Sequence, residues 1–151
     1  MLRLVLAAVH LIALGIGLGA VWARGRALAA AHEQGALRRA FAADGWWGVA
    51  ALLWIGSGLW RLLAGTEKAT TYYTHNHVFW AKMGLLVLIL ALEVWPMLTL
   101  IRWRRRSKSS VAGADSATAR AIARISYVQA ALIVAMVVAA VGMARGYGAG
   151  R

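Results

Sequence analysis

The stretch HNHVFWAKMGLLVLILALEVWPM, residues 75–97, decides the fold, because it is long and apolar enough to cross a lipid bilayer. A helix rises about 1.5 Å per residue, and crossing the hydrocarbon core takes about 20 apolar residues. The stretch nevertheless contains two ionisable residues, Lys82 and Glu93. A charged side chain at the centre of a membrane helix costs roughly 3 kcal/mol on insertion scales. Both residues therefore need partners that offset this cost.

The composition of the whole chain agrees with a membrane protein. Of its 151 residues, 62% are hydrophobic and 15% are charged, against about 25% charged residues in a soluble domain. Asp115 or Ser116 is suited to cap the last apolar segment as a helix. We predict an all-α fold in which residues 1–151 form a single membrane domain, a polytopic four-transmembrane-helix bundle. Its helices are expected near 3–23, 45–65, 77–101 and 125–145.

Basic residues are distributed unevenly between the predicted connections. The connections 24–44, which includes Arg24, and 102–124 are rich in arginine, whereas the opposite side of the bundle has few basic residues. By the positive-inside rule, these two connections are cytoplasmic and both termini of this multi-pass protein lie outside. The net charge of +12 then indicates contact with anionic lipid headgroups and no nucleic-acid partner.

Polar residues follow one face of each predicted helix. Positions seven or eleven apart return to within about 20° of the same helix face. Such residues in a membrane protein point into the bundle or into a wet cavity, so we predict an interior site shared by all four helices. The spacing occurs at His75, Lys82 and Glu93, at Arg3, His10, Gly17 and Arg24, at Trp47, Trp54 and Arg61, and at Gln129, Met136 and Met143.

The predicted interior site has two layers along the bundle. Lys82 and Glu93 are eleven residues apart, which is roughly 16 Å along a helix and too far for a direct ion pair. His10 and Arg61 are expected at the depth of Lys82, in the outer layer. Glu93 is expected in the inner half, near the depth of Gln129, Tyr127 and Ser126, with which a neutral Glu93 could form hydrogen bonds.

Haem b or another porphyrin, in a redox role, suits this set of side chains. Helical bundles hold haem through imidazoles on facing helices, and Lys82 and Arg61 could pair with the propionates. The candidate cofactor-binding residues are His10, Lys82, Arg61, His75 and Glu93. A protein with this cofactor would be a membrane oxidoreductase.

Two alternatives remain open at this point. Because the chain has no cysteine, a copper site would use His10, Met136 and Met143, and the histidines of the HNH triplet, His75 and His77, are further ligands that copper accepts. The other alternative is a non-catalytic membrane component that acts through a partner, either a redox partner or a second copy of the chain. A homodimer would use the glycine-rich first helix.

Four segments resemble a family of bacterial four-helix membrane proteins of unknown function: AVHLIALGIGLGAVWARGRAL, AADGWWGVAALLWIGSGLWRL, NHVFWAKMGLLVLILALEVWPM and ARISYVQAALIV. More distantly, the chain is similar to membrane-type protoporphyrinogen oxidase and the copper-resistance protein D group. His10, Arg26 and Lys82 stand at the places of that oxidase family's first-helix histidine, the following arginine and the third-helix lysine. The resemblance implies a b-type haem or porphyrin near His10 and Lys82. Glu93 replaces the family's second histidine and Gln129 its fourth-helix acidic residue, so the oxidase reaction itself is not implied.

Overall fold

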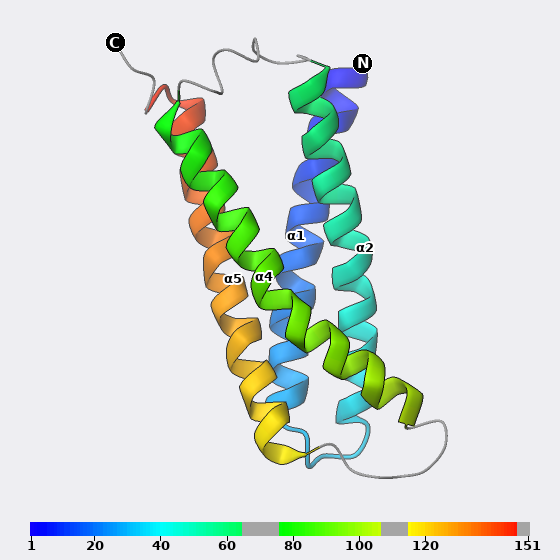
Figure 1. The fold of residues 1–151 in the computed structure, drawn as a ribbon. Coiled ribbons are helices and arrows are strands. Elements are labelled where there is room, and N and C mark those ends of the chain that lie inside the picture. Colours follow the sequence, from blue (N-terminus) through cyan, green and yellow to red (C-terminus); the bar gives the residue numbers. More distant parts are fainter. Residues whose placement is uncertain (65–75, 107–114, 148–151) are drawn as a thin grey trace.

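The computed structural model describes residues 1–64, 76–106 and 115–147, and nearly all of them are helical (Figure 1). This confirms the predicted all-α bundle. Helix α1 begins and α5 ends at the same end of the bundle, which we call the outer end; the opposite end is the inner end. The helices are α1 (Leu2–Ala29), α2 (Ala36–Leu63), α4 (His77–Arg106) and α5 (Ser116–Ala144).

The surface of the bundle is that of a membrane protein. Among the described helices, α1, α4 and α5 are each long and apolar enough to span a bilayer. Large apolar side chains lie exposed along the helices, such as Leu52 of α2, Val87 of α4 and Val138 of α5. A lipid environment accommodates these side chains, because it is as apolar as they are.

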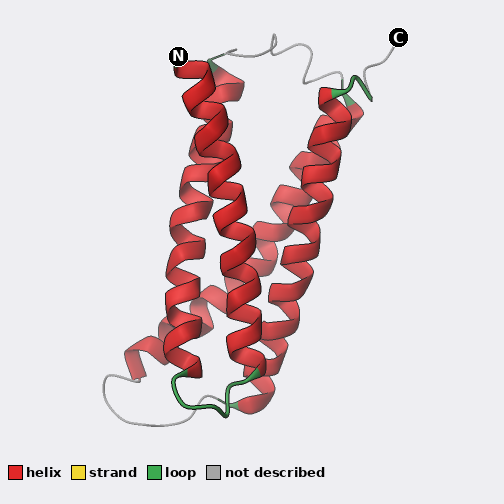
Figure 2. Ribbon diagram, turned by 180° about the vertical axis from the view of Figure 1, so that it is seen from behind, coloured by secondary structure: helices red, strands yellow, loops and turns green. Residues whose placement is uncertain are grey.

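The helices are arranged as two pairs that diverge towards the outer end (Figures 1 and 2). One pair is α1 with α2, which make the most extensive helix contact in the described bundle, and the other is α4 with α5. The two pairs meet mainly where α1 packs on α5, whereas α2 and α4 make few contacts. The two helix pairs are therefore close together at the inner end and further apart towards the outer end.

The first connection is shorter than the predicted range 24–44, whose sequence favours an amphipathic helix that continues the first span. Helix α1 continues to Ala29 and α2 begins at Ala36, so residues 30–35 alone join them. Gly35 has φ 75°, a left-handed conformation that glycine adopts without steric cost. Arg24, assigned from the sequence to a cytoplasmic loop, instead lies inside α1 and is fully buried. Arg24 can be buried because the carboxylates of Asp44 and Glu93 neutralise its charge within the bundle.

The start of α5 has the predicted cap. The carboxylate of Asp115 accepts hydrogen bonds from the backbone N–H groups of Ala117 and Thr118, at 3.2 and 3.1 Å. The hydroxyl group of Thr118 also donates to this carboxylate, at 2.6 Å. These bonds satisfy backbone donors that have no partner within a helix. The expectation that Asp115 caps the helix is confirmed.

Helix α4 starts at the HNH triplet, and the middle residue has the structural role. The side-chain Oδ1 of Asn76 accepts hydrogen bonds from the backbone N–H groups of Val78 and Phe79, at 2.9 and 3.3 Å. Asn76 is fully buried, whereas His77 is exposed. His75 lies outside the described residues. Asn76 is therefore a helix cap, although its two flanking histidines make the triplet look like a metal-binding motif.

Candidate functional site

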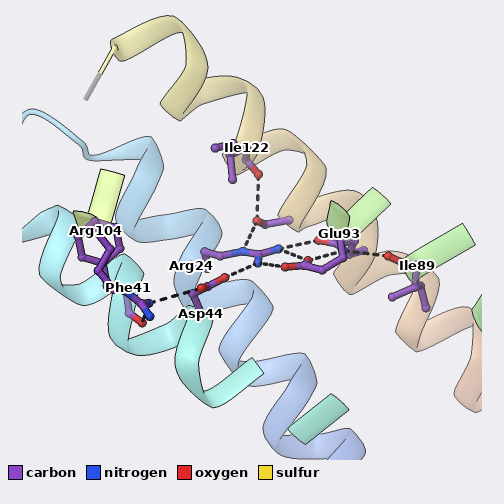
Figure 3. Close-up of polar contacts among 9 residues, drawn as sticks. Arg24, Phe41, Asp44, Ile89, Glu93, Arg104 and Ile122 are labelled. Atoms are coloured by element: carbon purple, nitrogen blue, oxygen red, sulfur yellow. Dashed lines mark hydrogen bonds and ion pairs between the residues drawn. The ribbon is translucent and has the colours of Figure 1, made fainter. Parts of the chain in front are cut away.

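A buried arginine joins the helices in the inner half of the bundle (Figure 3). Arg24 of α1 has no exposed surface. Its Nη1 and Nη2 groups donate to the two carboxylate oxygens of Glu93 on α4, at 2.6 and 2.8 Å. Such bidentate pairs are among the strongest hydrogen-bonded ion pairs in proteins. The partner that Glu93 needs within the bilayer is therefore an arginine on another helix.

The remaining N–H groups of Arg24 have partners on the other two helices. Nη1 also donates to Oδ1 of Asp44 on α2, at 3.0 Å. On α5, Nη2 donates to Oε1 of Gln129 at 2.8 Å, and Nε donates to the hydroxyl oxygen of Ser126 at 3.0 Å. A guanidinium has five N–H donors, and all five are satisfied. We call Arg24, Asp44, Glu93, Ser126 and Gln129 the inner polar cluster.

The partners of Arg24 are themselves held in place. The side-chain amide of Gln129 donates to Oε2 of Glu93 at 2.8 Å and to the backbone carbonyl of Ile89 at 3.2 Å. The hydroxyl group of Ser126 donates to the carbonyl of Ile122 at 2.9 Å. A fully satisfied buried network is rigid and favours one packing arrangement over others. The inner polar cluster thus defines how the four described helices assemble.

The cluster continues to the inner end of the bundle through Arg104 of α4. Its Nη2 atom lies 3.5 Å from Oδ2 of Asp44 and donates to the carbonyl of Phe41 at 3.0 Å. The guanidinium also lies over the ring of Phe41, 5.2 Å from the ring centroid, which is within cation–π distance. Arg104 therefore attaches the inner end of α4 to α2.

A cavity of about 180 Å³ lies in the outer half of the bundle, and we call it the outer cavity. Side chains from each of the described helices line it. The polar and sulfur-containing lining residues are His10 of α1, Trp54 and Arg61 of α2, Lys82 and Met83 of α4, and Met136 and Met143 of α5. The rest of the lining is formed by apolar side chains and by Gly58.

His10 is bound to one turn of α2. Its Nε2 atom accepts a hydrogen bond from the indole N–H of Trp54 at 3.2 Å, and its Nδ1 atom lies 3.0 Å from the hydroxyl oxygen of Ser57. That hydroxyl group donates to the backbone carbonyl of Trp54 at 3.1 Å. A Cβ atom at Gly58 would lie 3.0 Å from Cε1 of His10, so glycine permits the ring to approach the helix.

The structure divides the candidate site residues between two places. The outer cavity brings together His10, Arg61, Lys82, Met136 and Met143. Glu93 does not line it and belongs to the inner polar cluster. Arg26, which the oxidase resemblance singles out, is exposed at the inner end of α1. Arg24 was missed as the partner of Glu93, although its place on the polar face of the first helix was the signal that could have identified it.

The outer cavity sets conditions on any cofactor. Within the part of the chain that the structure describes, no group of three or more His, Asp or Glu residues could hold a metal ion. Among these described residues, a copper ion at His10 would have the sulfur atoms of Met136 and Met143 as its further ligands in the cavity. A porphyrin exceeds a cavity of about 180 Å³, because even drug-sized ligands occupy pockets of roughly 300–1,000 Å³. It would enter only if α2 and α4 moved apart, and ligation by Nε2 of His10 would replace the hydrogen bond from Trp54.

The fold and its two polar sites define a small polytopic membrane protein built of α-helices. Residues 2–148 match the family described as "Predicted membrane protein (DUF2214)", and the chain belongs to that family. No curated protein and no solved structure matches the chain.

Proposed function

We propose that the outer cavity binds haem b or a related porphyrin, and that the protein has a redox role in the bacterial inner membrane. The observation that carries this proposal is the convergence of His10, Arg61 and Lys82, from three helices, on one cavity. Imidazole is the common protein ligand of haem iron in helical bundles. When bound, haem would supply one-electron chemistry, which the amino-acid side chains at this site do not supply.

The charged and apolar residues that line the cavity match the two parts of a porphyrin, which would enter after α2 and α4 have moved apart. Arg61 and Lys82 are half-buried, near the outer ends of their helices, where they can form charge-assisted hydrogen bonds with propionates. The apolar macrocycle would lie against Leu59, Leu62 and Leu86. The distant resemblance to membrane-type protoporphyrinogen oxidase at His10 and Lys82 favours the same class of ligand.

Titration of the purified protein with hemin in mild detergent tests this proposal. We expect a Soret band shifted from that of free hemin, and we expect His10→Ala to abolish the shift. The matched control is His77→Ala, because His77 is exposed and does not line the cavity. A Soret band that is the same in the wild type and in His10→Ala would refute ligation by His10.

Copper is the second candidate, because His10, Met136 and Met143 line the same cavity. A neutral imidazole and thioether sulfur atoms suit copper(I). Competition with a chromogenic copper(I) chelator under anaerobic conditions tests it. Met136→Leu and Met143→Leu should each weaken copper binding, whereas Met97→Leu, on the surface of α4, should not. Equal affinities in all three variants would exclude this site.

A non-catalytic component is the outcome if the protein binds neither group. Its partner could be a redox protein or a second copy of the chain, since Gly15 and Gly19 of α1 have no neighbouring atoms near their Cβ positions. In either case, we propose that exposed arginines at the inner end contact anionic lipid headgroups of the cytoplasmic leaflet. These arginines are Arg26, Arg38, Arg39, Arg102, Arg104, Arg105, Arg106, Arg120 and Arg124.

A further inference from the structure

The contacts of His10 determine which of its ring nitrogens carries the proton. The indole N–H of Trp54 is a donor without acceptor capacity, and it points at Nε2 of His10 from 3.2 Å. Nε2 must therefore offer its lone pair. In a neutral imidazole the single proton is then on Nδ1, which faces the hydroxyl oxygen of Ser57 at 3.0 Å.

The hydroxyl group of Ser57 requires the same assignment. Its one proton is directed to the backbone carbonyl of Trp54, at 3.1 Å, so its oxygen is left to accept. Nδ1–H of His10 is the donor that it faces. The three hydrogen bonds, from Trp54 to His10, from His10 to Ser57 and from Ser57 to the carbonyl of Trp54, have consistent donors and acceptors. The opposite tautomer of His10 would place its Nε2–H group against the indole N–H of Trp54.

One turn of α2 supplies all of these contacts. Trp54 and Ser57 are three residues apart and are both buried, so their side chains project from neighbouring points of one helix face. Gly58 lets the imidazole lie against the same turn, because a Cβ there would come within 3.0 Å of the ring. The rings of His10 and Trp54 are 6.2 Å apart between centroids. The position of His10 is therefore fixed by α2 as well as by α1.

We infer that this turn of α2 presets His10 as an electron-pair donor for the outer cavity. Ser57 is a positioning residue that holds the proton on Nδ1. Trp54 caps the lone pair of Nε2 until a metal centre replaces the indole N–H. The identity of that centre, haem iron or copper, rests on the function proposed above, whereas the tautomer and the cap belong to the protein without its ligand.

Nitrogen-15 NMR of histidine-labelled protein in micelles, without any ligand, tests the tautomer. The signals that disappear in His10→Asn belong to His10, and we expect a protonated Nδ1 and an unprotonated Nε2. Ser57→Ala should increase the population with the proton on Nε2, and Ser57→Thr, which keeps the hydroxyl group, should restore the wild-type spectrum. A wild-type protein with the proton predominantly on Nε2 overturns the inference.

Ligand titrations test the cap. Trp54→Phe removes the indole N–H and keeps an aromatic ring, so hemin should bind more tightly, by up to roughly tenfold for one net hydrogen bond. Metal-free protoporphyrin should bind the wild type and Trp54→Phe equally, because it has no metal to ligate. Trp95→Phe, on the exposed face of α4, is the matched control. An equal gain for both porphyrins overturns the cap, and so does no gain for hemin.

The two proposals fail in different ways. If neither porphyrin binds the wild type, the proposed porphyrin site fails, while the NMR result still decides the tautomer. If Trp54→Phe does not fold, Gly58→Ala replaces it, because the added methyl group would displace the imidazole from Ser57 and change the His10 signals. Gly56→Ala, with nothing within 4 Å of its Cβ position, should leave them unchanged. Identical His10 signals for Gly58→Ala and wild type would refute the proposed close packing of His10 against this turn of α2.

Discussion

Arg24 shows how an apolar bundle accommodates a strong charge. Its guanidinium is bound to two carboxylates and two neutral groups, so that no N–H donor is left unsatisfied. A buried ion pair contributes little net stability compared with an apolar pair of the same shape, yet removal of one partner is strongly destabilising. The contribution of the cluster to stability is therefore seen as the loss of unfolding free energy when one partner is removed.

Arg24→Ala should lower the free energy of unfolding by about 3–5 kcal/mol, because Glu93 then remains buried without a counter-charge. Arg24→Lys should not restore stability, since an ammonium group cannot form the bidentate contact. Unfolding in mixed micelles with increasing denaturing detergent measures the change. Arg26→Ala, on the exposed face of the same helix, is the control. A loss of stability no larger than in this control would show that the ion pair is not needed.

Close packing beside the cluster gives a second prediction. A Cβ at Gly25 would lie 3.0–3.2 Å from the ring of Tyr127, which forms an edge contact with Trp22 at 5.2 Å between centroids. Gly25→Ala should therefore destabilise the protein by about 1–3 kcal/mol, as overpacked cores do. Gly19→Ala meets no neighbouring atom within 4 Å and should leave stability unchanged or higher. Equal unfolding midpoints for the two variants would contradict the packing.

The residue scale is also where the sequence was least informative. Helical spacing placed Glu93 on an interior face near Gln129, Tyr127 and Ser126, and of these three the structure shows the hydrogen bond with Gln129. The same spacing could not pair Glu93 with Arg24, because the two are 69 positions apart on helices whose rotations a single sequence does not fix. Arg24 was counted among the loop arginines that indicate membrane orientation, so its ion pair with Glu93 was not predicted.

At the level of helices, capping residues determine where α4 and α5 begin. Sequence preference identified Asp115, since an aspartate before a helical segment is a strong signal. It did not identify Asn76, because the flanking histidines suggested ligands instead. The apolar lengths predicted four helices, but they did not give the ends of α1 and α2, which the inner polar cluster and the turn at Gly35 extend beyond the apolar runs.

The cap of α5 should weaken in acid. Hydrogen bonds from the hydroxyl group and backbone N–H of Thr118, and from the backbone of Ala117, hold the pKa of Asp115 below its usual value. A lowered folded-state pKa gives stability that is present above the unfolded pKa, about 3.9, and is lost as the pH falls through the folded value. The protection of the backbone amides of Ala117 and Thr118 from hydrogen exchange, relative to the intrinsic rate at each pH, should therefore fall in that acidic range.

Asp115→Ala should show exchange near the intrinsic rate at every pH, whereas Ser116→Ala, one position further along, should retain the acid-dependent loss of protection. The comparison isolates the carboxylate from general effects of acid on the intrinsic exchange rate. If exchange at Thr118 in the wild type followed the intrinsic rate throughout, the cap would contribute nothing in solution.

At the scale of the whole molecule, the helices are held together by more side-chain contacts at the inner end of the described bundle than at the outer end. The inner end is joined by the polar cluster and Arg104, whereas at the outer end α2 and α4 bound a cavity and touch little. A ligand larger than the cavity must therefore separate the outer ends of these helices and leave their inner ends in place. Hydropathy predicted the bundle but not this asymmetry, which depends on how the two helix pairs cross.

Distances between spin labels test this difference. The natural chain has no cysteine, so labels can be attached at Leu63→Cys with Ala81→Cys near the outer end, and at Ala42→Cys with Ile101→Cys near the inner end. All four positions are exposed. Addition of hemin should lengthen the outer distance and leave the inner distance unchanged. Binding without a change in the outer distance would show that the cavity admits the ligand without opening.

The sequence positions of the carboxylates that bind Arg24 have a consequence for biosynthesis. Asp44 follows Arg24 by 20 positions and Glu93 follows it by 69, so α1 and α2 are synthesised before Glu93. Of its two carboxylate partners, Asp44 is thus the first available to the guanidinium during insertion. Glu93 is made later and joins the α4–α5 pair to the α1–α2 pair. We expect Asp44→Asn to impair insertion of nascent chains that end after α2, a stage at which Glu93→Gln can have no effect.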